Sequence, residues 1–589
     1  MLSQIMIFNI KWMKRSLLVL VILFGSHSSS AGMQQLATRL QQDVRSGRLT
    51  QARALAYELM AIRSPESLPA EYQGLAPTWT RRTTELKMKA KALLPTLTGE
   101  DKKLLASLLY RPGPDELPET LVSPAGLFKI HYTTSGNSAA DPAFIEETAR
   151  TFDYVYDFEI NKLGYQPPPS DNNVDGPEYD VYVHNFADYG ATTYEDPVPS
   201  TPYDDYTSWI EIDNDFSHTP TKGLDGMRVT AAHEFFHMIQ IGYRSYQTTT
   251  LSSVFLFESC AAWMEDVVFD SVNDYYYYLP SFFKRVETPF YKSDGMHEYG
   301  LSIFYHMLTK KYGVDAIRRI WEKFRYNEHF DAMDKALNDY GSNLSTELAE
   351  FWAWNVFTGS RADTVNYYPE GTFYPELKPS ESLDFSNTVS FSGKNSELVA
   401  RAFKLLPQSS GNFVLWPTFQ DPYSWIYSVA VFTPDEQATF QLGGADVSKS
   451  VPSVTSLSEV WVMPVNVSLP TSDYTQHKLD FQFKIEKGKA APPKNEIISV
   501  VPNPFMPENH GQVEIRFRLA RLTDDVFLTI LTEHGRTVKR IALGKKPDGL
   551  NKCMWDGRGD NGELVVSGVY LFYVEADGII GPSKLALIR

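Results

Sequence analysis

Apolar residues recur at helical spacing through the first part of the chain, before any strand pattern begins. The runs at 33–44, 49–62 and 86–94 repeat apolar positions every three or four residues, which predicts amphipathic helices. The tetrapeptide Arg-Pro-Gly-Pro at 111–114 then interrupts this pattern and predicts a linker. Residues 32–115 are therefore expected to form a helical N-terminal region.

From residue 121 to residue 375 the pattern is mixed, with alternating segments set between helical ones. Segments 127–133 and 179–184 predict strands. Segment 208–213 (Ser-Trp-Ile-Glu-Ile-Asp) also alternates, and we expect it at a sheet edge, where it could pair with an extended substrate backbone. Helical periodicity is predicted for residues 144–163, 227–243, 256–269, 300–312, 314–325 and 347–357. Residues 121–375 are expected to form one mixed domain.

The last two hundred residues show short alternating segments between turn residues, which indicates β-structure. Residues 385–487 predict a β-sandwich, the stretch 487–495 a linker, and residues 497–589 a second all-β unit of immunoglobulin size. The expected fold class is multidomain α+β: a domain with a mixed sheet and helices, preceded by a helical segment and followed by two β-sandwich domains.

Residues 1–31 have the three parts of a signal peptide. Lys11, Lys14 and Arg15 form a basic region, residues 17–24 an apolar core, and the small residues 29–31 a cleavage site. The alternative is an uncleaved anchor. No later segment reaches eighteen apolar residues, so no transmembrane segment is expected after cleavage. We expect a secreted or cell-surface protein.

Composition narrows the classes of partner. The net charge of −17, with no cluster of basic residues, argues against a nucleic-acid partner. The two cysteines, Cys260 and Cys553, lie in different predicted domains and offer no disulfide framework. At 589 residues the chain is too long for one hydrophobic core, in agreement with several domains.

The pentapeptide His-Glu-Phe-Phe-His at 233–237 is the strongest chemical signal. Residues four apart share one face of a helix, so His233 and His237 can bind one ion. Glu234 can then reach a water at that ion as a general base. Two imidazoles plus a carboxylate suit Zn²⁺, and a fourth position left to water is typical of a catalytic site. The alternative is an amphipathic core helix whose two histidines are satisfied internally.

The third ligand separates the classes of zinc peptidase. A metzincin would have Gly at 240 and His at 243, where this chain has Gln240 and Tyr243. Residues 258–266 (Glu-Ser-Cys-Ala-Ala-Trp-Met-Glu-Asp) instead predict a second helix. Glu258 and Glu265 share a face of it but lie about 10 Å apart, so only one of them can bind the ion.

This pair of segments resembles the gluzincin metallopeptidases, in which a Glu on the second helix is the third ligand. The resemblance implies that Glu258 is that ligand and that Glu265 supports the site from behind. Residues 297–300 (His-Glu-Tyr-Gly) are similar to a Tyr-Glu-Lys-Gly helix start in the aminopeptidase branch, whose Tyr stabilises the oxyanion. Here His297 takes that place and Tyr299 follows, so either could donate to the oxyanion; the alternative is that both are packing residues. The Gly-x-Met-Glu-Asn segment of that branch is missing, which favours an endopeptidase.

Two further resemblances cover other parts of the chain. Residues 100–330 are similar to a family of predicted secreted bacterial metalloproteases. The C-terminal unit resembles the Ig-like module of flagellar hook-capping proteins and type IX secretion sorting domains, which implies a link to secretion machinery or cell-surface attachment. The segments that carry this second likeness are Pro-Asn-Pro-Phe at 502–505, Gly-Arg-Thr-Val at 535–538, Trp-Asp-Gly at 555–557, Ser-Gly-Val-Tyr at 567–570 and Lys-Leu-Ala-Leu-Ile-Arg at 584–589.

Together these observations predict a secreted bacterial zinc metalloendopeptidase acting on a protein or peptide. Two alternatives stay open: an inactive surface protein that binds or adheres through its β-sandwiches, and a zinc hydrolase that does not cleave peptides. The helical residues 32–110 are either a pro-region that covers the active site or a subdomain that stays attached.

Overall fold

The computed structural model describes residues 28–171, 173–245, 253–419, 421, 424–433, 437–443, 448–470, 478–488, 495–547 and 549–589. Two compact units are found: the first comprises residues 1–380 with 396–402 and 469–477, and the second comprises 381–395, 403–468 and 478–589. Most of the predicted signal peptide and most of the 487–495 linker lie outside the described residues. No helix in the described ranges has the length and apolarity to cross a membrane.

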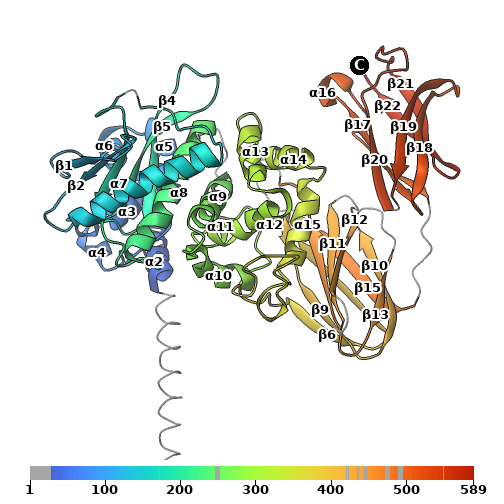
Figure 1. Cartoon of the computed structure of the whole chain (residues 1–589), viewed down its shortest axis with the longest axis horizontal. Helices are drawn as coiled ribbons and strands as arrows, with labels where there is room; N and C mark the ends of the chain where they lie inside the picture. Colours follow the sequence, from blue (N-terminus) through green and yellow to red (C-terminus); the bar gives the residue numbers. More distant parts are fainter. Residues whose placement is uncertain are drawn as a thin grey trace, which may run out of the picture. The chain divides into compact units, whose positions relative to one another are not determined.

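The first unit is built on one mixed sheet (Figure 1) with strand order β1-β2-β3-β5-β4. β2, β3 and β5 run parallel, and the two outer strands β1 and β4 pair antiparallel with their neighbours. The strands are β1 (Glu119–Val122), β2 (Phe128–Tyr132), β3 (Tyr179–His184), β4 (Gly190–Pro197) and β5 (Tyr206–Asp213). The sheet matches the mixed α+β class expected from the sequence.

The expectation that segment 208–213 forms a sheet edge is wrong. This segment is β5, which pairs with β3 on one side and β4 on the other. Its alternating polar residues are buried because they have internal partners: Glu211 pairs with Lys87, and Asp213 accepts from the backbone amides of Phe186 and Phe216. The edge strands are β1 and β4, and α5 (Thr83–Leu93) packs beside β4.

Helices α7 (Pro142–Tyr156) and α8 (Gly223–Tyr243) pack on this sheet. α8 contacts β5, β4, α7 and α9 (Val254–Val268), and from Gly226 to Tyr243 every residue except Arg228 is buried. α7 begins where the Asp141 side chain accepts from the amide of Ala143 at 2.8 Å. The helices after β2 are α7 (Pro142–Tyr156), continued by a π-helical segment (Asp157–Lys162), α8 (Gly223–Tyr243), α9 (Val254–Val268), α10 (Leu279–Lys284), α11 (His297–Gly300), α12 (Ser302–Tyr312), α13 (Asp315–Phe324), α14 (His329–Asn338) and α15 (Leu344–Trp354). The predicted helices are therefore present, with 300–312 divided between α11 and α12.

The N-terminal helices share an apolar core with Phe186 and Ala191, which lie at the sheet, and belong to the same compact unit as the sheet. They are α2 (Ser28–Arg45), α3 (Gln51–Arg63), α4 (Ala70–Gln73), α5 and α6 (Gly99–Ser107). The stretch 111–114 has no regular structure, as expected, but it is held in place: Arg111 pairs with Asp171 at 2.8 Å, with Asp180 and with Glu195.

The second unit contains two β-sandwiches. In the first, β13-β10-β15-β7 form one sheet and β12-β11-β14-β9-β6 run in order through the other. Its core is a cluster of aromatic and branched side chains such as Phe403, Phe413 and Phe483. The strands are β6 (Glu381–Phe385), β7 (Thr388–Asn395), β9 (Phe403–Pro407), β10 (Gly411–Phe419), β11 (Trp425–Phe432), β12 (Gln437–Gly443), β13 (Lys449–Val454), β14 (Glu459–Asn466) and β15 (Leu479–Lys487); the short β8 (Val399–Ala400) belongs to the first unit.

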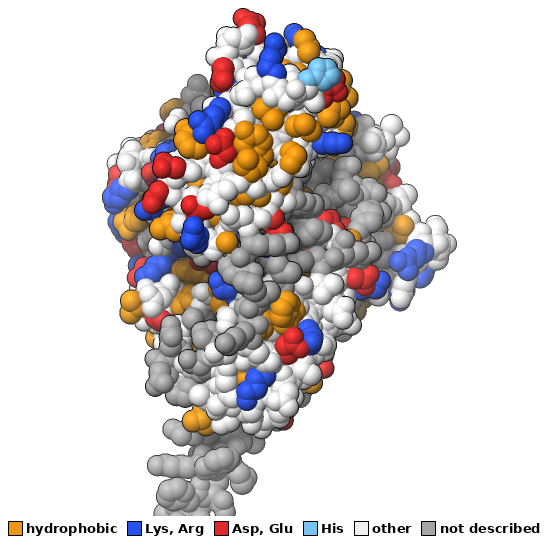
Figure 2. Space-filling model, turned by 90° about the vertical axis from the view of Figure 1, so that its right-hand side faces the viewer, with side chains coloured by type: hydrophobic (Ala, Val, Ile, Leu, Met, Phe, Trp, Pro, Cys, Tyr) orange, Lys and Arg blue, Asp and Glu red, His pale blue; other side chains and the backbone are white. Residues whose placement is uncertain are grey.

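The C-terminal sandwich packs sheet β16-β17-β20 and sheet β19-β18-β21-β22 around Trp555, Phe517 and Phe572. Its elements are β16 (Glu496–Val501), α16 (Pro507–His510), β17 (Val513–Leu519), β18 (Thr523–Thr532), β19 (Thr537–Lys546), β20 (Gly549–Trp555), β21 (Gly568–Glu575) and β22 (Ile579–Leu587). On the face drawn in Figure 2, acidic and basic side chains are interspersed instead of gathered by sign.

Candidate metal centre

Helices α8 and α9 bring two histidines and one glutamate together inside the first unit. His233 and His237 lie one turn apart on α8, and Glu258 lies on α9. One ligand atom of each residue lies within 4.8 Å of the other two, and all three side chains are buried. The Nε2 atoms of His233 and His237 lie 3.3 and 3.5 Å from Glu258 Oε2. The structure thus places the three predicted ligands at one point.

Each histidine is held through its other ring nitrogen. His233 Nδ1 lies 2.6 Å from Glu265 Oε1, and His237 Nδ1 lies 2.6 Å from Gln240 Oε1. Gln240 is itself fixed, because its amide nitrogen donates to the carbonyl of Phe257 at 3.0 Å. Since the carboxylate and amide oxygens accept, each Nδ1 carries a proton and each Nε2 faces the centre, where it can offer a lone pair to an ion. Metal-binding histidines are oriented in this way.

The sequence predicted the supporting position of Glu265 but not that of Gln240. Gln240 follows His237 by three residues, so both lie on the same face of α8. That spacing was the available signal.

His237 Nε2 shows whether these residues fit a cation. This atom is buried and has no hydrogen-bond partner within the described residues. A buried lone pair beside a carboxylate is an incomplete polar set that a cation would complete. Two imidazoles and one carboxylate are a donor set that zinc takes in catalytic sites. The residues therefore fit Zn²⁺.

The charges of the centre favour a cation as well. Burial raises the pKa of Glu258, but His237 and His233 outweigh burial and hold it well below its usual range. Burial lowers the pKa of His233, but the contacts with Glu258 and Glu265 outweigh it and raise that pKa to about 10. His233 therefore holds a proton at neutral pH that a metal must displace, so metal affinity should rise with pH.

Glu234 lies beside the three ligands and is held from the sheet. Thr192 Oγ1, on the edge strand β4, lies 2.8 Å from Glu234 Oε2 and 2.9 Å from the Glu234 carbonyl oxygen. Gly190 lies so close that an added Cβ would meet Glu234 Cγ at 2.9 Å and Thr230 Cγ2 at 2.8 Å. A side chain at Gly190 would therefore displace Glu234. Neither Thr192 nor Gly190 could be found from the sequence, because each is brought to Glu234 by the packing of β4 on α8.

The structure separates the two candidate oxyanion donors. The ring of Tyr299 lies against the ring of His233, with centroids 6.0 Å apart and planes inclined by 24°. Its hydroxyl donates to the carbonyl oxygen of Arg81 at 3.0 Å. His297 instead stacks on Phe282 at 5.2 Å, and neither of its ring nitrogens has a hydrogen-bond partner in the described part of the chain. Only Tyr299 of the two touches a ligand residue.

Comparison with known proteins identifies the C-terminal module. Residues 506–578 match the FlgD Ig-like domain family. The expected Ig-like fold is confirmed. Residues 132–354, which include both histidines and Glu258, match DUF6055, a family of unknown function. No curated protein matches the chain.

Solved structures that are similar to parts of this chain include the following three. FlgD from P. aeruginosa is 21% identical with a TM-score of 0.12, covering 16% of this chain and 65% of its own. PorZ, a surface component of the type IX secretion system of Porphyromonas gingivalis, is 20% identical with a TM-score of 0.12, covering 22% of this chain and 14% of its own. Latent PorU from the same organism is 13% identical with a TM-score of 0.16, covering 36% of this chain and 19% of its own. The chain spans less than two thirds of each, and at these TM-scores none carries an argument about fold or function.

A third acid on α9 makes the stability of the first unit depend on pH. Burial, together with the nearby acidic groups of Glu370, Asp270 and Glu265, raises the pKa of Asp266 to about 8. The folded protein therefore keeps a proton that the unfolded chain releases above about pH 4, so the free energy of unfolding falls between about pH 4 and pH 8. We expect Asp266→Asn to raise the melting temperature at pH 8.5 by several degrees, with a smaller gain at pH 5. Thermal melts at both pH values test this, with the exposed Asp115→Asn as control; equal gains for Asp266→Asn at the two pH values would contradict it.

Proposed function

We propose that this protein is an exported zinc metalloendopeptidase of the gluzincin type. The observation that carries the proposal is the buried set of His233, His237 and Glu258, with both Nδ1 atoms tied to oxygens and both Nε2 atoms facing one carboxylate. A core helix with internally satisfied histidines would not leave His237 Nε2 without a partner.

The residues around the centre divide the chemistry between them. Zinc, when bound to the three ligands, would supply the Lewis acid that polarises the scissile carbonyl and acidifies a water. Glu234 would take the proton of the attacking water and pass it to the leaving amine. Thr192 holds the Glu234 carboxylate by its hydroxyl, which restricts the positions from which the proton can be taken. Tyr299 would donate to the developing oxyanion, after turning its hydroxyl away from the Arg81 carbonyl.

The ends of the chain support export in this proposal. Residues 1–31 have the pattern of a signal peptide, and residues 506–578 match an Ig-like domain of hook-capping proteins. The C-terminal module would then engage secretion machinery or hold the enzyme at the cell surface. The substrate would be a protein or peptide outside the cytoplasm.

The deciding experiment measures metal and cleavage together on purified residues 32–589. Equimolar zinc, casein cleavage, loss of cleavage with a chelator and recovery with added zinc would support the proposal. Zinc without cleavage of casein or a mixed peptide library, but with hydrolysis of ester or amide substrates, would favour a non-proteolytic hydrolase. Absence of zinc at all pH values tested would refute the metal centre.

The two candidate oxyanion donors can be compared by mutation. Because only Tyr299 reaches the ligand His233, we expect Tyr299→Phe to lower kcat about 10²-fold with little change in KM. His297→Gln should change kcat less than threefold, since His297 packs on Phe282 away from the ligands. Steady-state kinetics with a fluorogenic peptide tests both. A larger loss in the His297 variant than in the Tyr299 variant would reverse the assignment.

A further inference from the structure

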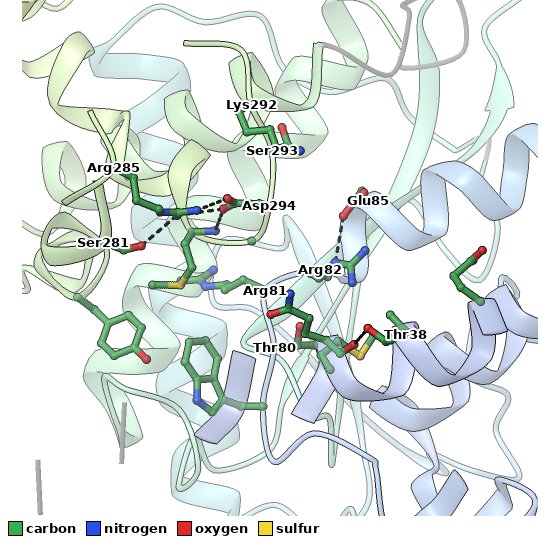
Figure 3. A pocket seen from close by; sticks show the side chains of 18 of the residues that line it. Thr38, Thr80, Arg81, Arg82, Glu85, Ser281, Arg285, Lys292, Ser293 and Asp294 are labelled. Atoms are coloured by element: carbon green, nitrogen blue, oxygen red, sulfur yellow. Dashed lines mark hydrogen bonds and ion pairs between the residues drawn. The ribbon is translucent and has the colours of Figure 1, made fainter. Parts of the chain in front are cut away.

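A short connecting segment of the N-terminal helical region, here called the strap, lies against Glu265, the residue that holds the ligand His233. We define the strap as residues 79–82, between α4 and α5. Together with α2 it faces the segment 277–296 across a cavity of about 760 Å³. Figure 3 shows Thr80, Arg81 and Arg82 on one side of this cavity and Arg285 and Asp294 on the other. Arg82 and Arg285 are paired with Glu85 and Asp294 at the cavity.

Arg81 extends from the strap into the protein interior beneath the metal ligands. Its guanidinium lies 3.5 Å from Glu265 Oε1 and 3.2 Å from Asp274 Oδ2, and its Nε donates to the hydroxyl of Tyr278 at 2.8 Å. It also stacks 3.9 Å above the ring of Tyr189. The side chain is only 3% exposed, so these contacts are made away from water.

Arg81 is the main positively charged partner of the two carboxylates that it contacts. Glu265 and Asp274 are both buried, and Arg81 is the arginine or lysine that pairs with them in the described ranges. Glu265 is also the residue that holds His233 Nδ1 at 2.6 Å. One buried cation therefore stands behind the carboxylate that fixes the orientation of a ligand imidazole.

We propose that Arg81 is a positioning residue of the metal centre, and that the N-terminal helical region is a permanent part of the working enzyme. The proposal rests on the zinc centre proposed above. Arg81 holds the Glu265 carboxylate in place, so that His233 presents Nε2 toward the ion. Its backbone carbonyl also holds the hydroxyl of Tyr299.

The charges argue against a pro-region that is removed on activation. The N-terminal region partners four buried carboxylates of the sheet and helix domain, including the Arg81 pairs with Glu265 and Asp274. Thr83 Oγ1 donates to Asp188 at 2.6 Å, and Lys87 Nζ pairs with Glu211 at 2.7 Å. Removal of the region would leave these four carboxylates without these partners. Buried charges that lose their partners are strongly destabilising.

The positioning role can be tested by measuring zinc affinity in competition with a chromophoric chelator. Outer partners of metal-binding histidines typically contribute 10- to 100-fold in affinity. We expect Arg81→Met to weaken zinc binding about 10-fold or more, Arg81→Lys to weaken it less, and the neighbouring Arg82→Met to change it less than twofold. If Arg81 acts through Glu265, the double variant Arg81→Met/Glu265→Gln should bind zinc no more weakly than Glu265→Gln alone.

The outcomes separate this inference from the proposed function. Wild-type protein that binds no zinc would refute the metal centre and the positioning role with it. Zinc binding in the wild type, with equal effects of Arg81→Met and Arg82→Met or with fully additive effects in the double variant, would overturn the positioning role alone. If Arg81→Met does not fold, the zinc affinities of Arg81→Lys and Arg82→Lys are compared instead, and equal affinities would overturn the positioning role.

Excision of the N-terminal region tests its permanence. A specific protease site replacing residues 111–114 allows the region to be cut from the folded full-length protein. We expect the cut protein to keep the region bound through size-exclusion chromatography and to lose zinc and activity when the region is stripped off. A rise in activity after stripping, with zinc retained, would identify the region as a removable pro-segment and overturn the inference.

Discussion

Glu234→Gln is expected to lower peptide cleavage by about 10²- to 10⁴-fold while zinc stays bound at one equivalent, since general acid–base groups contribute that much. Glutamine has the size of glutamate but cannot take a proton from the attacking water. The Thr192 hydroxyl can still donate to the amide oxygen, so the side chain should keep its place. Single-turnover cleavage of a fluorogenic peptide, with zinc measured on the same sample, tests this prediction.

A matched control separates the loss of a base from the loss of a buried acid. Glu159 is also fully buried, lies in the π-helical segment that follows α7, and makes no side-chain hydrogen bond to a ligand residue. Glu159→Gln should leave cleavage within about twofold of the wild type. Cleavage that survives in Glu234→Gln would show that another group is the base; equal losses in the two variants would point to a general packing effect.

The sequence predicted the elements of the site well because the site is mostly local. His233, Glu234 and His237 lie within one helical turn, and the helical periodicity of the same run fixes which of them share a face. Glu258 and Glu265 followed from a second run of the same kind together with a family resemblance. Periodicity placed the two carboxylates on one face of the second helix, and the family resemblance assigned one as ligand and the other as support.

What the sequence could not supply are contacts between segments distant in the chain. Thr192 and Gly190 come to Glu234 from β4, and Arg81 comes to Glu265 from a strap more than a hundred residues upstream. Periodicity shows which face of an element is buried but not which element covers it. The position of β5 was misjudged for the same reason: its polar residues alternate as on an exposed edge, yet Glu211 is buried against Lys87.

The identity of the third ligand leads to the second large effect. Glu258→Gln is expected to weaken zinc binding more than 100-fold and to abolish cleavage, whereas Glu265→Gln should weaken zinc binding 10- to 100-fold, the range for outer partners. The reason is geometric. Glu258 Oε2 faces both Nε2 atoms at 3.3 and 3.5 Å, while Glu265 contacts the opposite nitrogen of His233.

The comparison of these two variants is sharp because both remove one carboxylate oxygen from the same helix, two turns apart and equally buried. Glu258→Gln removes a charge that balances the ion itself, so restoring zinc to millimolar concentration should rescue little activity. Glu265→Gln leaves the ligand set intact and only loosens His233, so high zinc should restore most of the cleavage. Chelator competition and a zinc titration of activity measure both quantities. The reverse ranking would make Glu265 the ligand and would require His233 to bind through Nδ1.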